Sequence, residues 1–226
     1  WLMGHNPSCR IMSASYSQML SIKHSLDCRL IMESDWYKQL FPDTILNKNC
    51  NQKSKFLTTK QGFRFATSVG GSATGEGGDF LIIDDPHNPS HIKSFKMRQK
   101  VIDWYEQTFS SRLNNKKTGS IILVMQRLHE EDLTGYLLSK SKNWQVLKLP
   151  AISEENKRFI IFGKEILISK GSPLQHERED IEQLRQIEED LGSHNFAAQY
   201  QQEPIPNKGN LLSSEWLSFY SDIDNN

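Results

Sequence analysis

The sequence has few cysteines and no long apolar run, and each shortage excludes a class of protein. Its three cysteines, Cys9, Cys28 and Cys50, show no CxxC spacing, so neither a zinc site nor a disulfide framework is indicated. Reduced thiols in a cytosolic compartment are expected. No apolar run approaches the roughly 20 residues of a membrane span, and the first residues lack a signal-peptide pattern. We therefore expect a cytoplasmic protein that has no membrane partner.

An excess of charge of either sign is also missing. The 27 Lys and Arg residues balance the 27 Asp and Glu residues, so the chain as a whole lacks the basic signature of a nucleic-acid-binding protein. The strongest local cluster is KSFKMRQK at 93–100, on a predicted helix. This pattern favours a solvated helix face over a row of phosphate contacts. A DNA partner must therefore be argued from other features.

Two adjacent carboxylates follow a wholly apolar segment in GGDFLIIDDPHNP, residues 77–89. The run at 80–83 is typical of a parallel strand that is buried on both faces. Asp84 and Asp85 then fall at the end of that strand, where open α/β sheets bind ligands. A carboxylate pair there can face a cation and phosphates. Alternatively, the two residues simply open a turn, helped by Pro86 and Pro89.

Strand-like and helix-like segments alternate along the first two thirds of the chain. We predict strands at 9–15, 80–83 and 120–125, all central in one sheet, and a hairpin of two short strands around Gly62. A helix is predicted at 16–34, with an apolar face formed by Met19, Ile22, Leu26, Leu30 and Ile31. A second long helix is predicted to start at a Ser90 cap and to run to Ser111. This order predicts an α/β fold with a mainly parallel sheet and helices on both faces.

The chain from Trp144 onward has a different pattern. Segments 144–152 and 158–168 are strand-like, with a turn at Gly163, and a charged helix is predicted from about Arg178 to Leu191, ended by Gly192. A short helix then stops at Pro204. We predict a small linker subdomain at 150–207 and a tail at 208–226, distinct from the core at 1–149.

Six blocks in collinear order resemble the large terminase subunit of tailed bacteriophages and prophages. The blocks are SASYSQMLSIKHS, GGSATGEGGDFLIIDDPH, DWYEQTFSSRL, SIILVMQRLHEEDLTGYLL, LPAI and FAAQYQQEPIPNKGNLLSSEW. That family packages double-stranded DNA into procapsids with an N-terminal ATPase of the P-loop NTPase type, followed by a nuclease domain. The resemblance implies Mg²⁺ and ATP as cofactors of the intact subunit. It also implies the portal protein and the small terminase subunit as partners, and a homo-oligomeric ring in the bacterial cytoplasm.

The resemblance also implies roles for individual residues. FLIIDD is similar to a Walker B strand, which makes Asp84 the magnesium residue and Asp85 the catalytic carboxylate that orients the attacking water. QRLHEED is similar to the coupling motif, in which Gln126 would sense the γ-phosphate. Arg127 would contact phosphate or pair with a following glutamate. The same segment could instead be an ordinary charged helix start.

Two departures from the family pattern set limits on activity. Glu76 stands where relatives carry a basic residue, and the sequence contains no P-loop of the form GxxxxGK[ST]. The glycine-rich loop 70–78 cannot replace it, because it has no lysine and precedes a strand. We therefore expect this chain, which begins at Trp1, to be the central piece of a longer subunit. Alone, it should bind no cofactor and be inactive. The nuclease domain would begin near Asp222.

Two other functions stay open at this point. The chain could be a non-catalytic prophage remnant or binding module. It could also be a different metal-dependent NTPase or nuclease that uses the Asp pair directly. Nucleotide binding, its absence in a folded chain, and metal-dependent DNA cleavage without ATP would separate the three.

Overall fold

The computed structural model describes residues 1–205, apart from the side chain of Ile161. The predicted tail at 208–226, with Asp222, lies outside the described residues. Two compact units are present: the first comprises Trp1–Gln126 and Glu131–Gln145, and the second comprises Arg127–Glu130 and the described residues from Val146.

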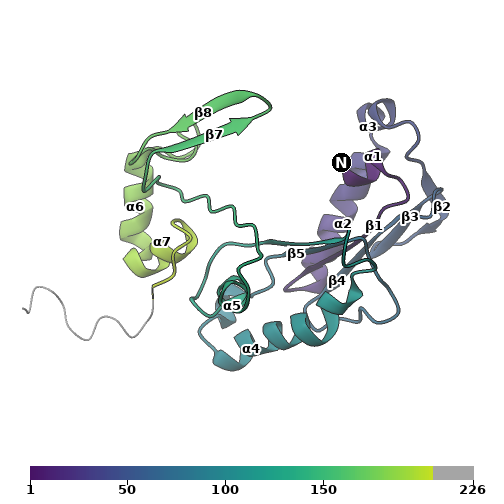
Figure 1. Ribbon diagram of the computed structural model, residues 1–226, viewed down its shortest axis with the longest axis horizontal. Helices are drawn as coiled ribbons and strands as arrows, with labels where there is room; N and C mark the ends of the chain where they lie inside the picture. The colour runs from purple at the N-terminus through teal and green to yellow at the C-terminus, as the bar shows by residue number, and fades with distance from the viewer. Residues whose placement is uncertain (206–226) are drawn as a thin grey trace, which may run out of the picture. The chain divides into compact units, whose positions relative to one another are not determined.

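Within the described residues, the first unit holds one mixed six-stranded sheet in the order β2-β3-β4-β1-β5-β6 (Figure 1). The strands are β1 (Arg10–Ser15), β2 (Leu46–Asn51), β3 (Lys55–Thr58), β4 (Phe63–Ser68), β5 (Phe80–Asp84) and β6 (Ser120–Val124). The neighbours β4, β1, β5 and β6 pair in parallel, whereas β2, β3 and β4 pair antiparallel. The mainly parallel α/β sheet is therefore confirmed.

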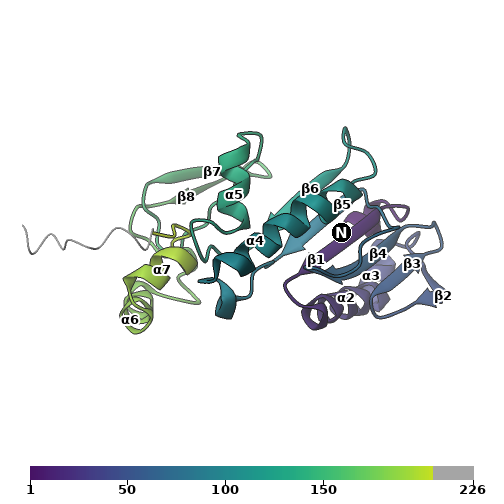
Figure 2. The same cartoon turned by 90° about the horizontal axis from the view of Figure 1, so that it is seen from below.

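Helices cover both faces of this sheet (Figure 2). The helical segments of the first unit are α1 (Leu2–His5), α2 (Gln18–Glu33), α3 (Asp35–Leu40), the 3-10 turn η1 (Pro89–His91), α4 (Phe95–Trp104), the π-helical turn η2 (Tyr105–Phe109), the 3-10 turn η3 (Ser110–Arg112) and α5 (Leu133–Lys140). Helices α2 and α3 lie on one face, and α4 lies on the other. This arrangement buries the central strands on both sides.

Strand β5 shows how the apolar run divides between the two faces. Leu81 and Ile83 are fully buried and join the core on the α4 face, while Phe80 and Ile82 pack into the core on the α2 face. Burying each such side chain contributes about 1.5–3 kcal/mol. Because side chains alternate along a strand, Asp84 falls on the α2 face. The burial of β5 on both sides is the feature that its unbroken apolar sequence predicts.

The face that α2 presents to the sheet differs from the predicted one. Met19 and Leu30 are 83% and 64% exposed, and the buried positions are Ser21, Ser25 and Met32. Small serine side chains let the helix backbone approach the sheet closely, so the serine face packs on the sheet in place of the more apolar one. The predicted apolar face of this helix is therefore wrong, although the helix itself is confirmed.

Strand β6 is an edge strand instead of the central strand that its sequence predicts. Among residues 1–205 it pairs with β5 on one side only, and Ile122 and Val124 are 38% and 56% exposed. A central strand and an edge strand can have the same apolar run, because the sequence of a strand does not state how many strands pair with it. The carboxyl end of β6 nevertheless lies beside that of β5, as predicted.

The second long helix begins later than predicted. Asn88, and not Ser90, caps the chain here, because the Asn88 side chain accepts a hydrogen bond from the Ser90 N–H at 3.0 Å and starts the short turn η1. Helix α4 starts only after Ser94. Pro89 favours the first position of such a turn, since it needs no N–H donor there. The predicted Ser90 cap is therefore wrong.

The described part of the second unit contains an antiparallel hairpin and two helices. Its elements are β7 (Lys157–Ile161), β8 (Lys164–Ile168), α6 (Ile181–Leu191) and α7 (Ser193–Gln199). Asp180 starts α6 with a capping box, and Gly192 ends it at a φ of 77°. The hairpin around Gly163 and both helices are confirmed. Residues 144–152 form no strand. At the end of this segment, Ala151 bonds to Leu174 and Tyr200, and the Ile152 N–H donates to the Gln201 side chain.

Candidate functional site

Asp84 and Asp85 lie at the carboxyl end of β5, where the sequence places them. Asp84 is the last residue of the strand and pairs in register with Val124 of β6. The Asp85 N–H donates to the Val124 carbonyl at 2.9 Å, and the Asp85 carbonyl accepts from the Tyr16 N–H at 3.0 Å. These bonds fix the Asp pair to the ends of both neighbouring strands.

The Asp85 backbone leaves the sheet in the left-handed region, with a φ of 43°. Non-glycine residues rarely adopt this conformation, and Asp and Asn tolerate it best. Pro86 and His87 follow and are both buried. The alternative that the Asp pair opens a turn is thus correct for the backbone, and the same turn sets the two carboxylates at the sheet edge.

The backbone of Gln126, and not its side chain, contacts the Asp85 carboxylate. The Gln126 N–H donates to Asp85 Oδ1 at 3.3 Å. Burial raises the pKa of the Asp85 carboxyl; the bond from Gln126 opposes that shift, the charge of Asp84 adds to it, and His24 opposes it. Asp85 is therefore a more basic carboxylate than an exposed one, which suits a group that accepts a proton or orients a water.

His24 is a neighbour of the Asp pair that no sequence pattern predicts. Its Nδ1 lies 3.3 Å from Asp84 Oδ2, and the two side chains are 33% and 39% exposed. Helix α2 carries His24 over the carboxyl end of the sheet, so the contact depends on how the helix crosses the strands. No local pattern around KHS encodes that crossing.

Arg64 on β4 is a second basic residue on this face of the sheet. Burial lowers the pKa of its guanidinium, while Cys28 and Asp84 shift that pKa in the opposite direction. Within the described residues, its buried Nη1 has no hydrogen-bond partner. The α2 face thus places a half-buried cation within the electrostatic reach of Asp84.

Arg127 belongs to the second unit, unlike the other three predicted site residues. Its N–H donates to the Gln202 side chain at 3.0 Å, and its Nη2 donates to the His129 carbonyl at 3.3 Å. Arg127 also contributes, after Lys148, to lowering the pKa of Glu203. These contacts tie Arg127 to the residues that follow α7.

Glu76 forms an ion pair with Lys55 of β3. The Lys55 ammonium also lies 4.7 Å from the centre of the Phe63 ring, at the amino end of β4. The Asp pair lies at the opposite, carboxyl end of the parallel strands. Glu76 therefore has a partner of its own and is directed away from the Asp pair.

The donor set at the Asp pair fits magnesium in type. Mg²⁺ prefers oxygen ligands and is commonly bound by one or two carboxylates together with water and substrate phosphates. Asp84 and Asp85 supply two carboxylates at one strand end, and no cluster of three His, Cys, Asp or Glu side chains arranged for a metal occurs among residues 1–205. A divalent ion here would thus need ligands from a substrate or from water.

Comparison with protein-family models finds no match, and comparison with curated proteins finds none either. Over the described part of the chain, no helix is both long and apolar enough to cross a membrane.

Proposed function

We propose that this chain forms part of the ATPase of a large terminase subunit, which drives double-stranded DNA into a procapsid. One observation carries the proposal: the Asp pair and Gln126 end two adjacent parallel strands and are joined by a hydrogen bond. Ligands of open α/β sheets bind at this edge. The order of the six sequence blocks supplies the family.

Each residue has a separate task in this proposal. Asp84 holds Mg²⁺, and Asp85, whose burial raises its pKa, orients the attacking water. The side chain of Gln126 senses the terminal phosphate. The metal, when bound, would offset the negative charge on the phosphates. His24 holds the Asp84 carboxylate in place, with its Nδ1 at 3.3 Å.

The ATPase also needs a phosphate cradle that these 226 residues do not encode. A strand with a P-loop would have to pair with the edge of β6 that no described residue occupies, because β5 occupies the other side of β6. A parallel strand at that edge would bring the loop at its carboxyl end beside Val124 and Gln126. Without it, we expect the chain alone to hydrolyse ATP negligibly.

The second unit is the linker of the proposed subunit. Arg127 contacts phosphate in this proposal, from a segment that its bonds to Gln202 and His129 hold in place. The intact subunit works as a homo-oligomeric ring with the portal protein and the small terminase subunit, in the cytoplasm of a bacterial host. These partners come from the resemblance alone.

Two alternatives remain distinct from this proposal. A prophage remnant or binding module would keep the fold without using the Asp pair. A metal-dependent nuclease would use the Asp pair directly on DNA. The raised pKa of Asp85 and its fixed position favour a catalytic role over the first alternative.

A set of assays on the folded chain separates the three functions. Metal binding is measured with Mn²⁺ as a paramagnetic substitute for Mg²⁺, and DNA cleavage is measured with Mg²⁺ in the absence of ATP. The ATPase proposal expects weak Mn²⁺ binding that Asp84→Ala removes, with Lys23→Ala as the surface control, and no cleavage of DNA. DNA cleavage that Asp84→Ala abolishes would establish the nuclease. Mn²⁺ binding that is unchanged in Asp84→Ala would support the non-catalytic alternative.

A further inference from the structure

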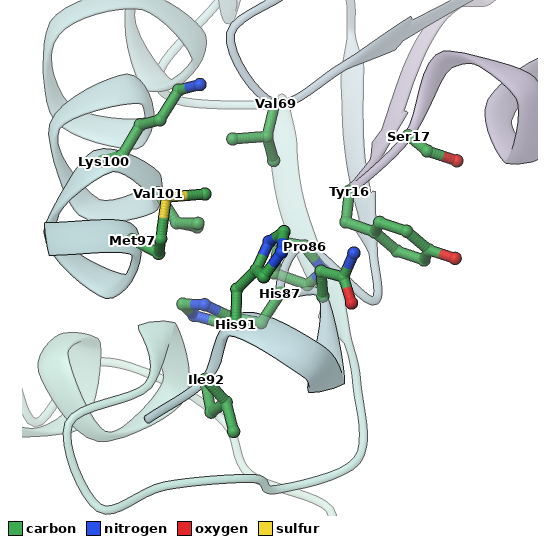
Figure 3. Close-up of a pocket in the computed structure, with 11 residues that line it drawn as sticks. Tyr16, Ser17, Val69, Pro86, His87, His91, Ile92, Met97, Lys100 and Val101 are labelled. Carbon is green, nitrogen blue, oxygen red and sulfur yellow. The ribbon is translucent and has the colours of Figure 1, made fainter. Parts of the chain in front are cut away.

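A cavity of about 280 Å³ lies beside the carboxyl ends of β1, β4 and β5, against helix α4 (Figure 3). It is lined by Tyr16, Ser17, Val69, Pro86, His87, Asn88, His91, Ile92, Met97, Lys100 and Val101. Helix α4 covers the face of the sheet opposite to α2 and His24. The cavity is therefore separate from the Asp84 carboxylate, which falls on the α2 face.

One wall of the cavity is apolar. Val69 follows β4, Met97 and Val101 project from α4, and Pro86 closes the cavity below β5. Val101 and Pro86 are buried, so this wall belongs to the packed core and is fixed in shape. Apolar walls of this kind bind flat rings, while a few polar groups set the orientation of the ligand.

The polar groups at the rim are basic. Lys100 and His91 are exposed side chains on the cavity lining, and none of the eleven described lining residues carries a carboxylate. Among residues 1–205, neither Lys100 nor His91 takes part in an ion pair. In a chain with no net charge, a cavity whose charges have one sign attracts anions.

Lys100 differs in this respect from Arg98 on the same helix. Arg98 is buried, donates to Glu131 at 2.6 Å and to the Ile92 carbonyl at 2.8 Å, and so is neutralised within the fold. The Lys100 stem passes close to Gly70, where an added Cβ would lie 3.6 Å from Lys100 Cε. The basic cluster of the sequence therefore divides into a structural cation, Arg98, and a cation at the cavity rim, Lys100.

His87 fixes the floor of the cavity. Its ring is 4% exposed, and its Nε2 accepts a hydrogen bond from the Leu133 N–H at 2.8 Å, at the start of α5. That bond sets the orientation of the ring that Figure 3 shows inside the cavity. His87 thus fixes the shape of the cavity floor, and little of its ring is open to a ligand.

We infer that this cavity binds one nucleotide unit, with the base against the apolar wall and the phosphate at Lys100 and His91. Its volume is close to the lower limit of roughly 300 Å³ for small-molecule sites, which suits a single nucleotide. The same chemistry occurs in a free nucleotide and in one unit of a nucleic-acid strand. Because the site is separate from the Asp84 carboxylate, its binding does not require a metal at Asp84.

The test measures binding of AMP to the whole 226-residue chain in the presence of EDTA, which excludes a metal-dependent nucleotide at Asp84. Lys100→Glu should weaken AMP binding about tenfold, as expected for loss of one charge-assisted contact. The control is Lys116→Glu, an exposed lysine in the loop before β6 that does not line the cavity. It should change binding by less than about twofold, since an exposed charge away from the cavity is screened.

His91→Ala gives a second, independent variant at the rim, and thermal unfolding checks that each variant is folded. Competition by a hexathymidylate strand would assign the site to nucleic acid, and its failure would assign it to free nucleotides. Equal loss in Lys100→Glu and Lys116→Glu would overturn the inference. So would absence of both AMP and oligonucleotide binding in the folded chain, or displacement of AMP by inorganic phosphate at equal concentration.

Discussion

The Gln126 N–H donates to Asp85 Oδ1 at 3.3 Å and joins the loops that follow two parallel strands, β6 and β5. Forty-one residues separate the two groups along the chain, so only the sheet brings them together. This bond places a backbone donor of the predicted coupling motif on the predicted catalytic carboxylate. The side chain of Gln126 is left to act on a ligand.

Asp85→Asn should raise the melting temperature at pH 7. Burial raises the pKa of Asp85, so the folded chain binds a proton more tightly than the unfolded chain does. The stability from this preference is fully present below the ordinary carboxyl pKa of about 3.9 and is lost as the pH rises through the higher folded pKa. At pH 7, Asp85 is then a partly buried charge that destabilises the fold. The Asn amide is neutral and avoids this cost.

The measurement is the difference in melting temperature between Asp85→Asn and the parent chain at pH 7 and at pH 4. The difference should be positive at pH 7 and should shrink toward pH 4, where Asp85 becomes protonated. Asp27→Asn is the control, because Asp27 is an exposed carboxylate in α2. A lower melting temperature for Asp85→Asn at pH 7 would contradict the raised pKa.

The buried face of α2 gives a prediction about packing. Ser25 is fully buried against the sheet, so Ser25→Leu should destabilise the fold by about 1–3 kcal/mol through overpacking. Leu30 is 64% exposed, and Leu30→Glu should change stability by less than about 0.5 kcal/mol. Urea unfolding of both variants measures this. A larger loss of stability in Leu30→Glu than in Ser25→Leu would indicate that the predicted apolar face packs on the sheet after all.

Gly62 should tolerate no side chain. An added Cβ would lie 2.3 Å from the Pro7 carbonyl oxygen and 2.7 Å from that of Cys9, and backbone cannot move aside easily. Gly62→Ala should therefore cost more than about 2 kcal/mol. Gly75 has a φ of 86° but nothing within 4 Å, so Gly75→Ala should cost only about 1–2 kcal/mol of backbone strain. Urea unfolding compares the two, and an equal or larger loss at Gly75 would be the contrary result.

The His24 and Asp84 pair should be only weakly coupled in the absence of a metal. Both side chains are at least a third exposed, and solvent-exposed pairs contribute about 0.2–1 kcal/mol. A double-mutant cycle with His24→Ala and Asp84→Asn, followed by urea unfolding, measures the coupling. A coupling free energy above about 2 kcal/mol would mean that the pair supports the fold itself, and that positioning of Asp84 is secondary.

Local patterns predicted most of the first unit. The apolar run of β5, the Gly62 hairpin and the order of strands and helices are encoded in neighbouring residues, and so is the position of the Asp pair at a strand end. The edge position of β6, the serine face of α2 and the His24 contact depend on which elements pack together, which no local pattern states. No sequence pattern predicts strand β2, because LNKNCN has little apolar character and lies at the edge of the sheet.

The most direct test of the proposed function is Mg²⁺-dependent phosphate release from ATP by a longer subunit that contains both a P-loop strand and this chain. We expect turnover in that subunit, a loss of about a hundredfold or more in Asp85→Asn because the water-orienting carboxylate is gone, and nearly unchanged nucleotide binding. The 226-residue chain assayed alone should stay at background. Turnover by the chain alone that Asp85→Asn abolishes would contradict the need for a P-loop, and turnover of the longer subunit that Asp85→Asn leaves intact would contradict the catalytic role of Asp85.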